Sequence, residues 1–513
     1  MRDIRIGKNV IEALTSGMYE DARFIYREYI QNAADSIDKA VEKGILKEIH
    51  EGSIHVTIDK TERKITIEDN GTGIRSDQVP SFLGNIALSE KDGTREKGFR
   101  GIGRLGGLGY CDRLVYETSF PGETIKSIMT WDAKDLRKKI DDPKLDLDAA
   151  SVINSIIKLD YNSEAENEHY FKVTLESVKN DDLLDKEGIE DYLSMVAPIP
   201  FANSFIFKSK ICSGLQKEGL DIDEYRIFLN TDQLFKAYAT AIYKGTETNK
   251  SRIDELFDVE FIDIRSGDES IAWGWYGLSK FESQMPKKSN PARGIRLRKH
   301  NIQIGSEDTL IRLHKEQRGN FYFFGEIHCL HPKLIPNARR DYFKDNELLK
   351  VFEEKLVALF HTKFYKLYHI ANDTKNACRK IVRPTEIETK LKEKSKNGFS
   401  NKEEKEKFEK EFIEAVETAN ENKIVLEKIE FRTKNDPVLS KVYEKIVDNF
   451  DMRNENRDIK PGTNTKTIFR TNKLSKLNKS EQKFLSKVFT VIDTVLTPDL
   501  AENLKQKIED EFK

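Results

Sequence analysis

A helical stretch near the start of the chain carries polar side chains at a spacing that could do chemistry. Glu28, Asn32 and Asp35 are four and three residues apart, so on a helix they share one face. The small residues Ala33 and Ala34 beside them would let another group come close. A solvated helix surface gives the same pattern, so this group alone does not decide between a site and a surface.

A second group is the turn Asp-Asn-Gly-Thr-Gly at residues 69–73, which follows a short apolar strand pattern. The carboxylate of Asp69 could accept a hydrogen bond from an exocyclic amine such as that of adenine. Gly71 and Gly73 permit positive φ angles and a close approach of the backbone to a flat ring. An ordinary Asn-Gly turn is the alternative interpretation.

A third group is the glycine-rich segment 98–109, Gly-Phe-Arg-Gly-Ile-Gly-Arg-Leu-Gly-Gly-Leu-Gly. Glycine-rich loops that lead into a helix present backbone N–H groups to phosphate oxygens. Such a pattern is weak evidence when it stands alone. Here it is the third member of an ordered set, which makes a phosphate-binding interpretation stronger.

The elements that would position these groups can be read from hydrophobic periodicity. Residues 25–42 predict a long helix. Apolar residues alternate at 54–58 and again at 65–67, which predicts a hairpin. Residues 170–175 predict a strand, and residues 189–195 predict a helix.

The rest of the chain changes character along its length. Residues 205–345 mix strands with turns, and the pattern becomes helical and charged from residue 345. The dense Lys and Glu content of 385–430 predicts a solvated helical face or a coiled coil. Residues 453–475 are polar and predict a linker, and 480–512 form a last amphipathic helical segment.

Composition narrows the class of protein. The 513 residues are 38% hydrophobic and 34% charged, with a formal net charge of −2. This excludes a global basic bias toward nucleic acid but leaves a local basic patch open. The four cysteines lie far apart and are expected to be buried, reduced thiols. With no signal-peptide core at the N-terminus and no apolar run of membrane-spanning length, we expect a cytoplasmic protein without membrane contact.

In this order and spacing, the three groups resemble the motifs of the GHKL superfamily of gyrases, heat-shock chaperones, histidine kinases and MutL. Residues 27–36 resemble its first motif, 69–73 its second and 98–103 its third. Within the superfamily the chain looks most like the heat-shock-ninety (HtpG-like) ATPases, with MORC-like and MutL-like features. The similarity extends to residues 83–89 and to Thr118.

The resemblance implies ATP and Mg²⁺ as cofactors and assigns roles to residues. Glu28 would orient or deprotonate the attacking water, Asn32 would be the Mg²⁺ ligand, and Asp69 would contact adenine. The nucleotide-binding residues implied are Asn32, Asp35, Asp69, Gly71, Gly73, Ile74, Gly98, Arg100, Gly101, Ile102, Gly103 and Thr118.

A positive charge for the γ-phosphate is expected from far along the chain. Residues 334–343 resemble the region of the heat-shock chaperones that supplies an arginine, and Arg340 aligns best, with Arg339 as the alternate. Upstream, Arg296, Arg298 and Lys299 lie in a strand pattern that resembles the middle domain of the same family. These three could instead contact nucleic acid, or form a charged strand edge.

The expected architecture is α+β in three parts. Residues 1–203 would form a Bergerat-type α/β sandwich, 204–370 a transducer-like α/β middle domain, and 371–513 a helical, charge-rich region. One functional interpretation is a chaperone-like ATPase that closes a lid, forms an ATP-dependent homodimer and acts on a protein client. The other is a DNA-associated MORC/MutL-like clamp, as in a bacterial genome-defence system, that uses Arg293 to His300 and basic parts of 374–410. A third interpretation is a nucleotide-gated scaffold with negligible ATP turnover. Glu28 argues against it, because such a scaffold has no need for a general base.

Overall fold

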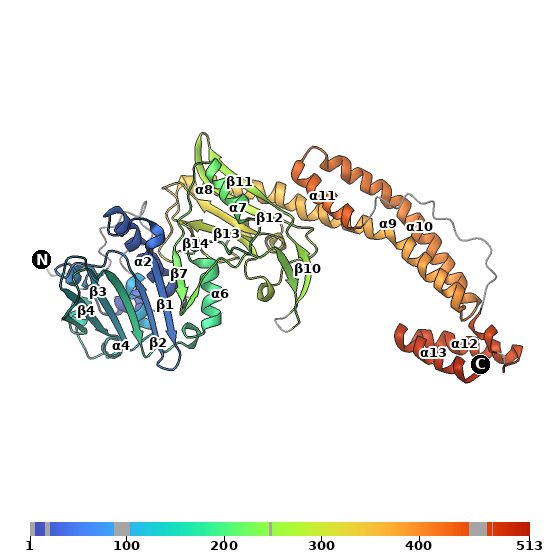
Figure 1. Cartoon of the computed structure of the whole chain (residues 1–513), viewed down its shortest axis with the longest axis horizontal. Coiled ribbons are helices and arrows are strands. Elements are labelled where there is room, and N and C mark those ends of the chain that lie inside the picture. Colours follow the sequence, from blue (N-terminus) through green and yellow to red (C-terminus); the bar gives the residue numbers. More distant parts are fainter. Residues whose placement is uncertain are drawn as a thin grey trace. The chain divides into compact units, whose positions relative to one another are not determined.

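The fold is taken from a computed structural model that describes residues 6–15, 21–86, 103–245, 249–450, 469–474 and 476–512. The chain divides into two compact units, Met1–Tyr365 and Lys366–Lys513 (Figure 1). Within the described ranges, no helix is both long and apolar enough to cross a membrane. The expected boundaries near residues 203 and 370 stay a prediction.

The first unit begins with a mixed eight-stranded sheet in the order β5-β4-β3-β6-β2-β1-β7-β8. The hairpin expected around residue 60 is confirmed, since β1 pairs antiparallel with β2 and Ile54 lies opposite Asp69. Strand β7 joins β1 in parallel, which makes the sheet mixed. The strands are β1 (Ser53–Asp59), β2 (Lys64–Asp69), β3 (Arg113–Ser119), β4 (Ile125–Asp132), β5 (Ile157–Ser163), β6 (Tyr170–Glu176), β7 (Arg226–Leu229) and β8 (Asp232–Gln233).

Helix α2 (Phe24–Glu42) packs against β1 and β2 and is the central helix of this layer. Its apolar face is buried completely, with Ile30, Ala33 and Ile37 each 2% exposed or less. Two carboxylates on the polar face, Glu28 and Asp35, are also buried, at 8% and 4% exposed, which is unusual for charged residues. The other helices here are α1 (Asn9–Thr15), α3 (Val79–Gly84), α4 (Ala133–Asp141), α5 (Ala149–Asn154), α6 (Lys186–Val196) and α7 (Lys208–Lys217).

A second, five-stranded sheet has the order β11-β12-β15-β13-β14, and β9 pairs with β10 beside it. Its core contains Trp273 and Trp275, packed with Phe201 and Phe205. The mixed α and β content of the first unit confirms the expected α+β class. The strands are β9 (Ala241–Lys244), β10 (Ser251–Glu255), β11 (Asp258–Ser266), β12 (Glu269–Leu278), β13 (Gly294–Lys299), β14 (Ile302–Ile304) and β15 (Phe324–Cys329); α8 (Glu347–Leu359) follows.

A fully buried ion cluster lies inside this second sheet and is centred on Glu326. Its carboxylate receives Lys236 Nζ at 2.9 Å, Arg298 Nε at 2.5 Å and His328 Nε2 at 3.0 Å. Burial opposes ionisation of Glu326, but the charges of Arg298 and Lys236 outweigh it and hold its pKa well below the usual value. Burial lowers the pKa of the Lys236 ammonium to about 8. Arg298 also donates to the carbonyl of Met195 on α6 at 2.7 Å, so the cluster connects the second sheet to α6.

This burial corrects one interpretation of the sequence. Arg296, Arg298 and Lys299 are 4%, 0% and 5% exposed, so they are neither a nucleic-acid surface nor a charged strand edge. Strand β13 lies between β14 and β15 rather than at the margin of the sheet. Each cation faces internal acceptors; Lys299, for example, donates to the backbone carbonyls of Leu330 and His331.

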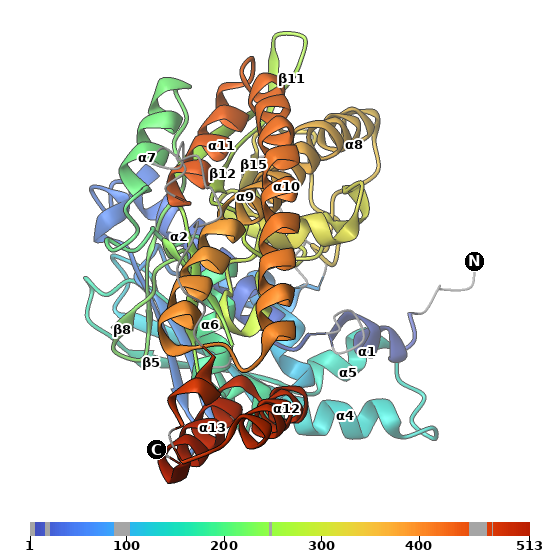
Figure 2. The same cartoon turned by 90° about the vertical axis from the view of Figure 1, so that its right-hand side faces the viewer.

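The second unit is helical, as expected. Helices α9 (Tyr365–Asn397) and α10 (Lys402–Thr433) run side by side in both views (Figures 1 and 2), and α11 (Pro437–Asn449) packs on α10. Between α9 and α10 lies a small apolar cluster that contains Ile387 and Phe412. Part of the Lys and Glu content of this stretch forms ion pairs, for instance Lys394 with Glu404 at 2.9 Å.

The last amphipathic segment is two helices, not one: α12 (Lys479–Val495) and α13 (Pro498–Phe512). Pro498 disfavours helical geometry at the residue before it and begins the second helix itself. The two helices pack through Phe489, Ile492 and Ala501. Most of the predicted linker 453–475 lies outside the described residues, including all of 453–468. All four cysteines are free as expected, although Cys212 is only half-buried.

The Glu326 cluster predicts a large loss of stability when its acceptor is removed. Glu326→Gln leaves Lys236 and Arg298 as buried cations without a counter-charge, which should reduce the free energy of unfolding by about 3–5 kcal/mol at pH 7. Urea unfolding followed by tryptophan fluorescence measures this. Glu347→Gln, whose side chain is 90% exposed, is the control and should change little.

The same substitution should change the acid dependence of stability. Because the folded-state pKa of Glu326 lies below its ordinary value of 4.5, its charge stabilises the fold above that pH. The contribution is lost as the pH falls below 4.5. Glu326→Gln should lack this part of the pH dependence, and an unchanged acid profile would contradict the assignment.

Candidate active site

The carboxylate of Glu28 lies buried on α2 between two guanidinium groups. The residue is 8% exposed. Its Oε1 lies 3.6 Å from Arg27 Nη2 on the same helix and 3.5 Å from Arg340 Nε, which is more than 300 residues away. These are ion-pair distances rather than hydrogen bonds, and Oε1 has no hydrogen-bond partner among the described residues. The structure therefore brings the predicted general base and the predicted arginine together.

Arg340 reaches this position from the tip of a short hairpin. Pro336 pairs antiparallel with Phe343, and Asn337 N donates to Tyr342 O at 2.9 Å. Arg340 itself has a φ of 54°, which is uncommon for a residue with a long side chain. Its carbonyl accepts from Gly305 N at 2.8 Å. Arg339 beside it is exposed, and its carbonyl accepts from Arg27 Nη2 at 3.2 Å.

Gly103 lies directly against the other oxygen of the same carboxylate. A Cβ atom at this position would lie 2.3 Å from Glu28 Oε2, so any other residue here would force the Glu28 carboxylate to move. The short helix that follows, Gly103–Gly109, is held by the hydroxyls of Tyr29 and Tyr116, which donate to Arg104 O at 2.9 and 2.7 Å. The other predicted members of the glycine loop, Gly98, Arg100, Gly101 and Ile102, lie outside the described residues.

The turn after β2 closes onto α2 from the other side. Asp69 is 2% exposed, and its Oδ1 accepts from Gly71 N at 2.9 Å. A Cβ at Gly71 would lie 2.1 Å from Ser36 Oγ, and Thr72 N donates to that hydroxyl at 3.1 Å. The helix and the turn are therefore in contact at Ser36, one residue past Asp35.

Gly73, Ile74 and Thr118 hold this turn to the neighbouring strands. Gly73 has a φ of +63°, and a Cβ on it would lie 1.8 Å from Ser119 O. Ile74 N donates to Thr118 Oγ1 at 2.9 Å, and that hydroxyl donates to Tyr170 O at 2.8 Å. In the structure Thr118 fixes the turn; its contact with a nucleotide stays a prediction.

The residue predicted to bind Mg²⁺ is Asn32 on α2. Asn32 is half-buried, and its side chain makes no hydrogen bond within the described ranges. Asp35, three residues on, is 4% exposed. The described residues contain no cluster of three or more acidic, histidine or cysteine ligands for a metal. The side-chain oxygen of Asn32 is a donor of the kind that Mg²⁺ takes when phosphate oxygens and waters supply its other ligands.

Two polar residues of the site were missed by the sequence interpretation. Arg27 flanks Glu28, but nothing in a sequence marks a contact with a hairpin more than 300 residues away. Gln31 is 1% exposed, and neither atom of its amide has a hydrogen-bond partner among the described residues. A buried amide with no partner is costly unless a ligand or water satisfies it. Its spacing of three from Glu28 was the available signal.

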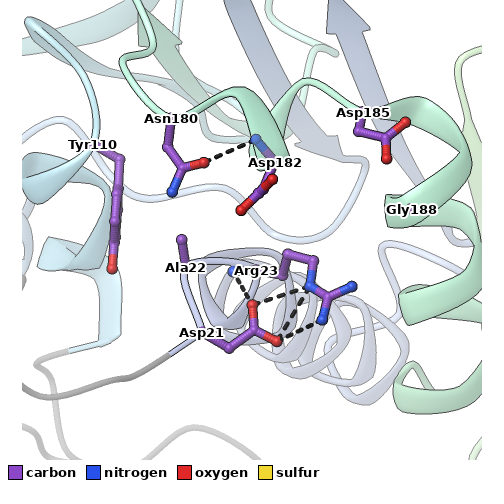
Figure 3. Close-up of a pocket in the computed structure, with 8 residues that line it drawn as sticks. All are labelled: Asp21, Ala22, Arg23, Tyr110, Asn180, Asp182, Asp185 and Gly188. Carbon is purple, nitrogen blue, oxygen red and sulfur yellow. Dashed lines mark hydrogen bonds and ion pairs between the residues drawn. The ribbon is translucent and has the colours of Figure 1, made fainter.

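An acidic pocket of about 530 Å³ opens at the N-terminal end of α2 (Figure 3). Asp21 and Arg23 point toward each other there, with Arg23 Nη2 2.8 Å from Asp21 Oδ2. Burial opposes ionisation of Asp21, but hydrogen bonds from Arg23 outweigh it and lower the pKa of the carboxyl. Asp182 and Asp185 lie across the pocket. Both residues of the pair also line the larger cavity described below.

The fit of Gly73 predicts a stability effect at the turn. In Gly73→Ala the new Cβ meets Ser119 O and must adopt a positive φ, so we expect a loss of at least about 2 kcal/mol in the free energy of unfolding. Thermal or urea unfolding measures it. Gly84→Ala is the matched control, because its Cβ meets nothing within 4 Å and its φ is not positive. Equal stability of the two variants would contradict the packing described.

Comparison with known proteins matches this same part of the chain. Residues 23–163 match the family described as "Histidine kinase-, DNA gyrase B-, and HSP90-like ATPase". Chaperone protein HtpG of Paraburkholderia xenovorans is 31% identical over 143 residues, which covers 25% of this chain and 23% of that protein. HtpG of Fusobacterium nucleatum is 29% identical over 131 residues, 22% of each chain.

These matches cover less than a quarter of the length of the curated relatives, so they describe one domain and not a whole protein. The family match at 23–163 includes α2 with Glu28, the turn at 69–73 that contacts α2 at Ser36, and Gly103, which contacts the Glu28 carboxylate. Residues 23–163 therefore form a GHKL-type ATPase domain that resembles the corresponding part of the HtpG chaperones.

Proposed function

We propose that this chain binds ATP with Mg²⁺ and hydrolyses it, and that hydrolysis drives conformational change in a chaperone-like protein. Lid closure by the segment around 98–103, ATP-dependent homodimerisation and action on a protein client belong to the same proposal. It rests on the ATPase-family match and on one geometric observation. That observation is the Glu28 carboxylate between Gly103, Arg27 and Arg340.

Each of these neighbours has a use in phosphoryl transfer to water. The water oxygen bonds to the γ-phosphorus while the bond from phosphorus to the β–γ bridging oxygen breaks. Glu28 takes a proton from the water, ADP keeps the bridging oxygen, and inorganic phosphate carries the oxygen of the water. Arg340 supplies positive charge for the phosphoryl oxygens as negative charge redistributes in the transition state. The absence of a side chain on Gly103 lets the phosphates approach Glu28 closely.

The other predicted residues would bind either the metal ion or the adenine ring. Asn32 would hold Mg²⁺, which supplies charge neutralisation at the phosphates when it is bound. Asp69 would accept from the adenine amine, and Gly71 and Gly73 let the backbone approach the ring. Asp35, Ile74 and Thr118 are proposed to complete the nucleotide pocket.

A DNA clamp is the less well supported alternative. Its proposed contacts at Arg296, Arg298 and Lys299 are buried, which removes the main basic surface assigned to DNA. In the second unit, Arg383 is paired with Glu411 and Lys394 with Glu404. Cations that are neutralised within the fold attract phosphates weakly, so the chaperone-like ATPase is the better conclusion.

The first test replaces the proposed base. Glu28→Ala should lower the rate of ATP hydrolysis by at least about a hundredfold, because no other carboxylate is proposed to take the proton. Steady-state ATPase assays measure the rate, and fluorescent-nucleotide titration should show that ATP still binds. Glu42→Ala, a carboxylate near the end of the same helix, is the control. Wild-type turnover in Glu28→Ala would remove Glu28 from the mechanism.

The second test concerns the distant arginine. Arg340→Ala should slow the single-turnover hydrolysis step by about a hundredfold or more with little change in ATP affinity. Since Arg340 has a positive φ, Arg340→Gly separates the charge from backbone strain and should be equally slow. Arg339→Ala should hydrolyse ATP at the wild-type rate. If Arg339→Ala is the slow variant instead, the role belongs to Arg339.

A further inference from the structure

A large cavity lies next to Arg27 and Arg340, the two residues that flank the Glu28 carboxylate. Its volume is about 940 Å³, and it is bounded by the start of α2, by α6, by the short helix Lys287–Ser289, by the turn at 305–309 and by the hairpin tip at 339–341. We call it the basic cavity. The proposed reaction does not use it, and its lining does not include the turn at 69–73.

The charge of the lining is strongly biased. Seven cationic side chains line the basic cavity against four carboxylates. Arg27 and Arg340 line it and also flank the Glu28 carboxylate at 3.6 and 3.5 Å. Gly103 meets the other oxygen of that carboxylate. The Glu28 carboxylate therefore contacts Gly103 through one oxygen and two lining residues of the basic cavity through the other.

The cations lead from the buried carboxylate to solvent. Arg296 is the buried cation of this series, at 4% exposed, and Lys287 is an exposed one, with a side chain that is 66% exposed. Glu307 forms an ion pair with each of them. Lys288 is exposed and makes no ion pair with any described residue. The basic cavity thus has a buried cationic end beside Glu28 and an exposed cationic mouth.

One inner group is left for a ligand. Arg296 donates from Nη2 to Pro291 O at 2.6 Å and from Nη1 to Gln303 Oε1 at 3.3 Å, but its buried Nε has no hydrogen-bond partner among the described residues. Burial lowers the pKa of this guanidinium, so an added anion would offset its desolvation. An oxyanion suits both needs, because guanidinium groups match its geometry.

We propose that the basic cavity binds inorganic phosphate and is the route by which the hydrolysis product leaves Glu28. The proposal rests on the proposed ATPase function. Phosphate formed beside Glu28 is next to Arg27 and Arg340, which already face the cavity. It moves past Arg296 toward Lys287 and Lys288, while ADP stays on the side of Asp69. The nucleotide and the phosphate then leave by separate openings.

The test changes the charge of the mouth in the full chain. Lys288→Glu repels phosphate without touching Glu28, Arg27 or Arg340, and Lys333→Glu is a matched charge reversal at an exposed lysine outside the cavity. Stopped-flow phosphate release and rapid-quench hydrolysis are compared. Release should slow by about tenfold in Lys288→Glu, whereas the chemical step and ATP affinity stay at the level of Lys333→Glu.

Direct binding separates this proposal from the proposed function. Inorganic phosphate titrated into the ADP-bound protein, followed by ³¹P NMR, should bind Lys288→Glu about tenfold more weakly than Lys333→Glu. This titration needs no turnover, so loss of the ATPase proposal would leave it interpretable. Equal phosphate affinity in the two variants, or unslowed release, would overturn the exit route. A phosphate site that a short single-stranded oligonucleotide fills more tightly, with release unchanged, would also overturn it.

Discussion

The buried negative charge of Glu28 constrains much of the first unit. A carboxylate that is 8% exposed loses most of its hydration, and that loss is tolerable only if cations stand close to it. Arg27 supplies one cation from the preceding position on α2, but a second cation must come from elsewhere in the chain. The hairpin that carries Arg340 docks at this point, and Arg27 also donates to its backbone at Arg339. The Glu28 carboxylate, which is the proposed general base, therefore also holds α2 and the hairpin of Arg340 together.

The position of that hairpin depends on a second buried cluster. Glu326 gathers Lys236 and Arg298, and Arg298 also donates to Met195 on α6. Strand β13, which carries Arg298, pairs with β14, and the turn after β14 holds the Arg340 carbonyl through Gly305. A chain of strong contacts therefore runs from α6 to the hairpin tip. Rigid support of this kind is what keeps a catalytic side chain at one distance from its partner.

Local features of the site could be predicted from sequence, and distant pairings could not. The helix at 25–42 and the hairpin between β1 and β2 follow from periodicity, because neighbours along the chain determine them. Arg340 was identified only by resemblance, since periodicity carries no information about a partner 312 positions away. The prediction that the cations of strand β13 are exposed was wrong for the same reason. Three cations in one strand indicate an exposed edge, because the sequence does not show that Glu326 and backbone carbonyls accept from two of them inside the fold. Gln31 gave no signal beyond its spacing from Glu28.

The contact between Arg340 and Glu28 has a consequence for how the site would work. The guanidinium group of Arg340 lies 3.5 Å from Glu28 Oε1, which is too long for a hydrogen bond, so another anion can replace this contact. The γ-phosphate of ATP carries more negative charge than a carboxylate and offers more acceptor oxygens, so Arg340 should prefer it. Transfer of Arg340 to the phosphate would leave Glu28 Oε1 open to a hydrogen bond from the attacking water. In the proposed reaction, nucleotide binding, the position of the hairpin and the contacts of Glu28 are therefore one coupled equilibrium, and ADP, which lacks the γ-phosphate, would return Arg340 to Glu28.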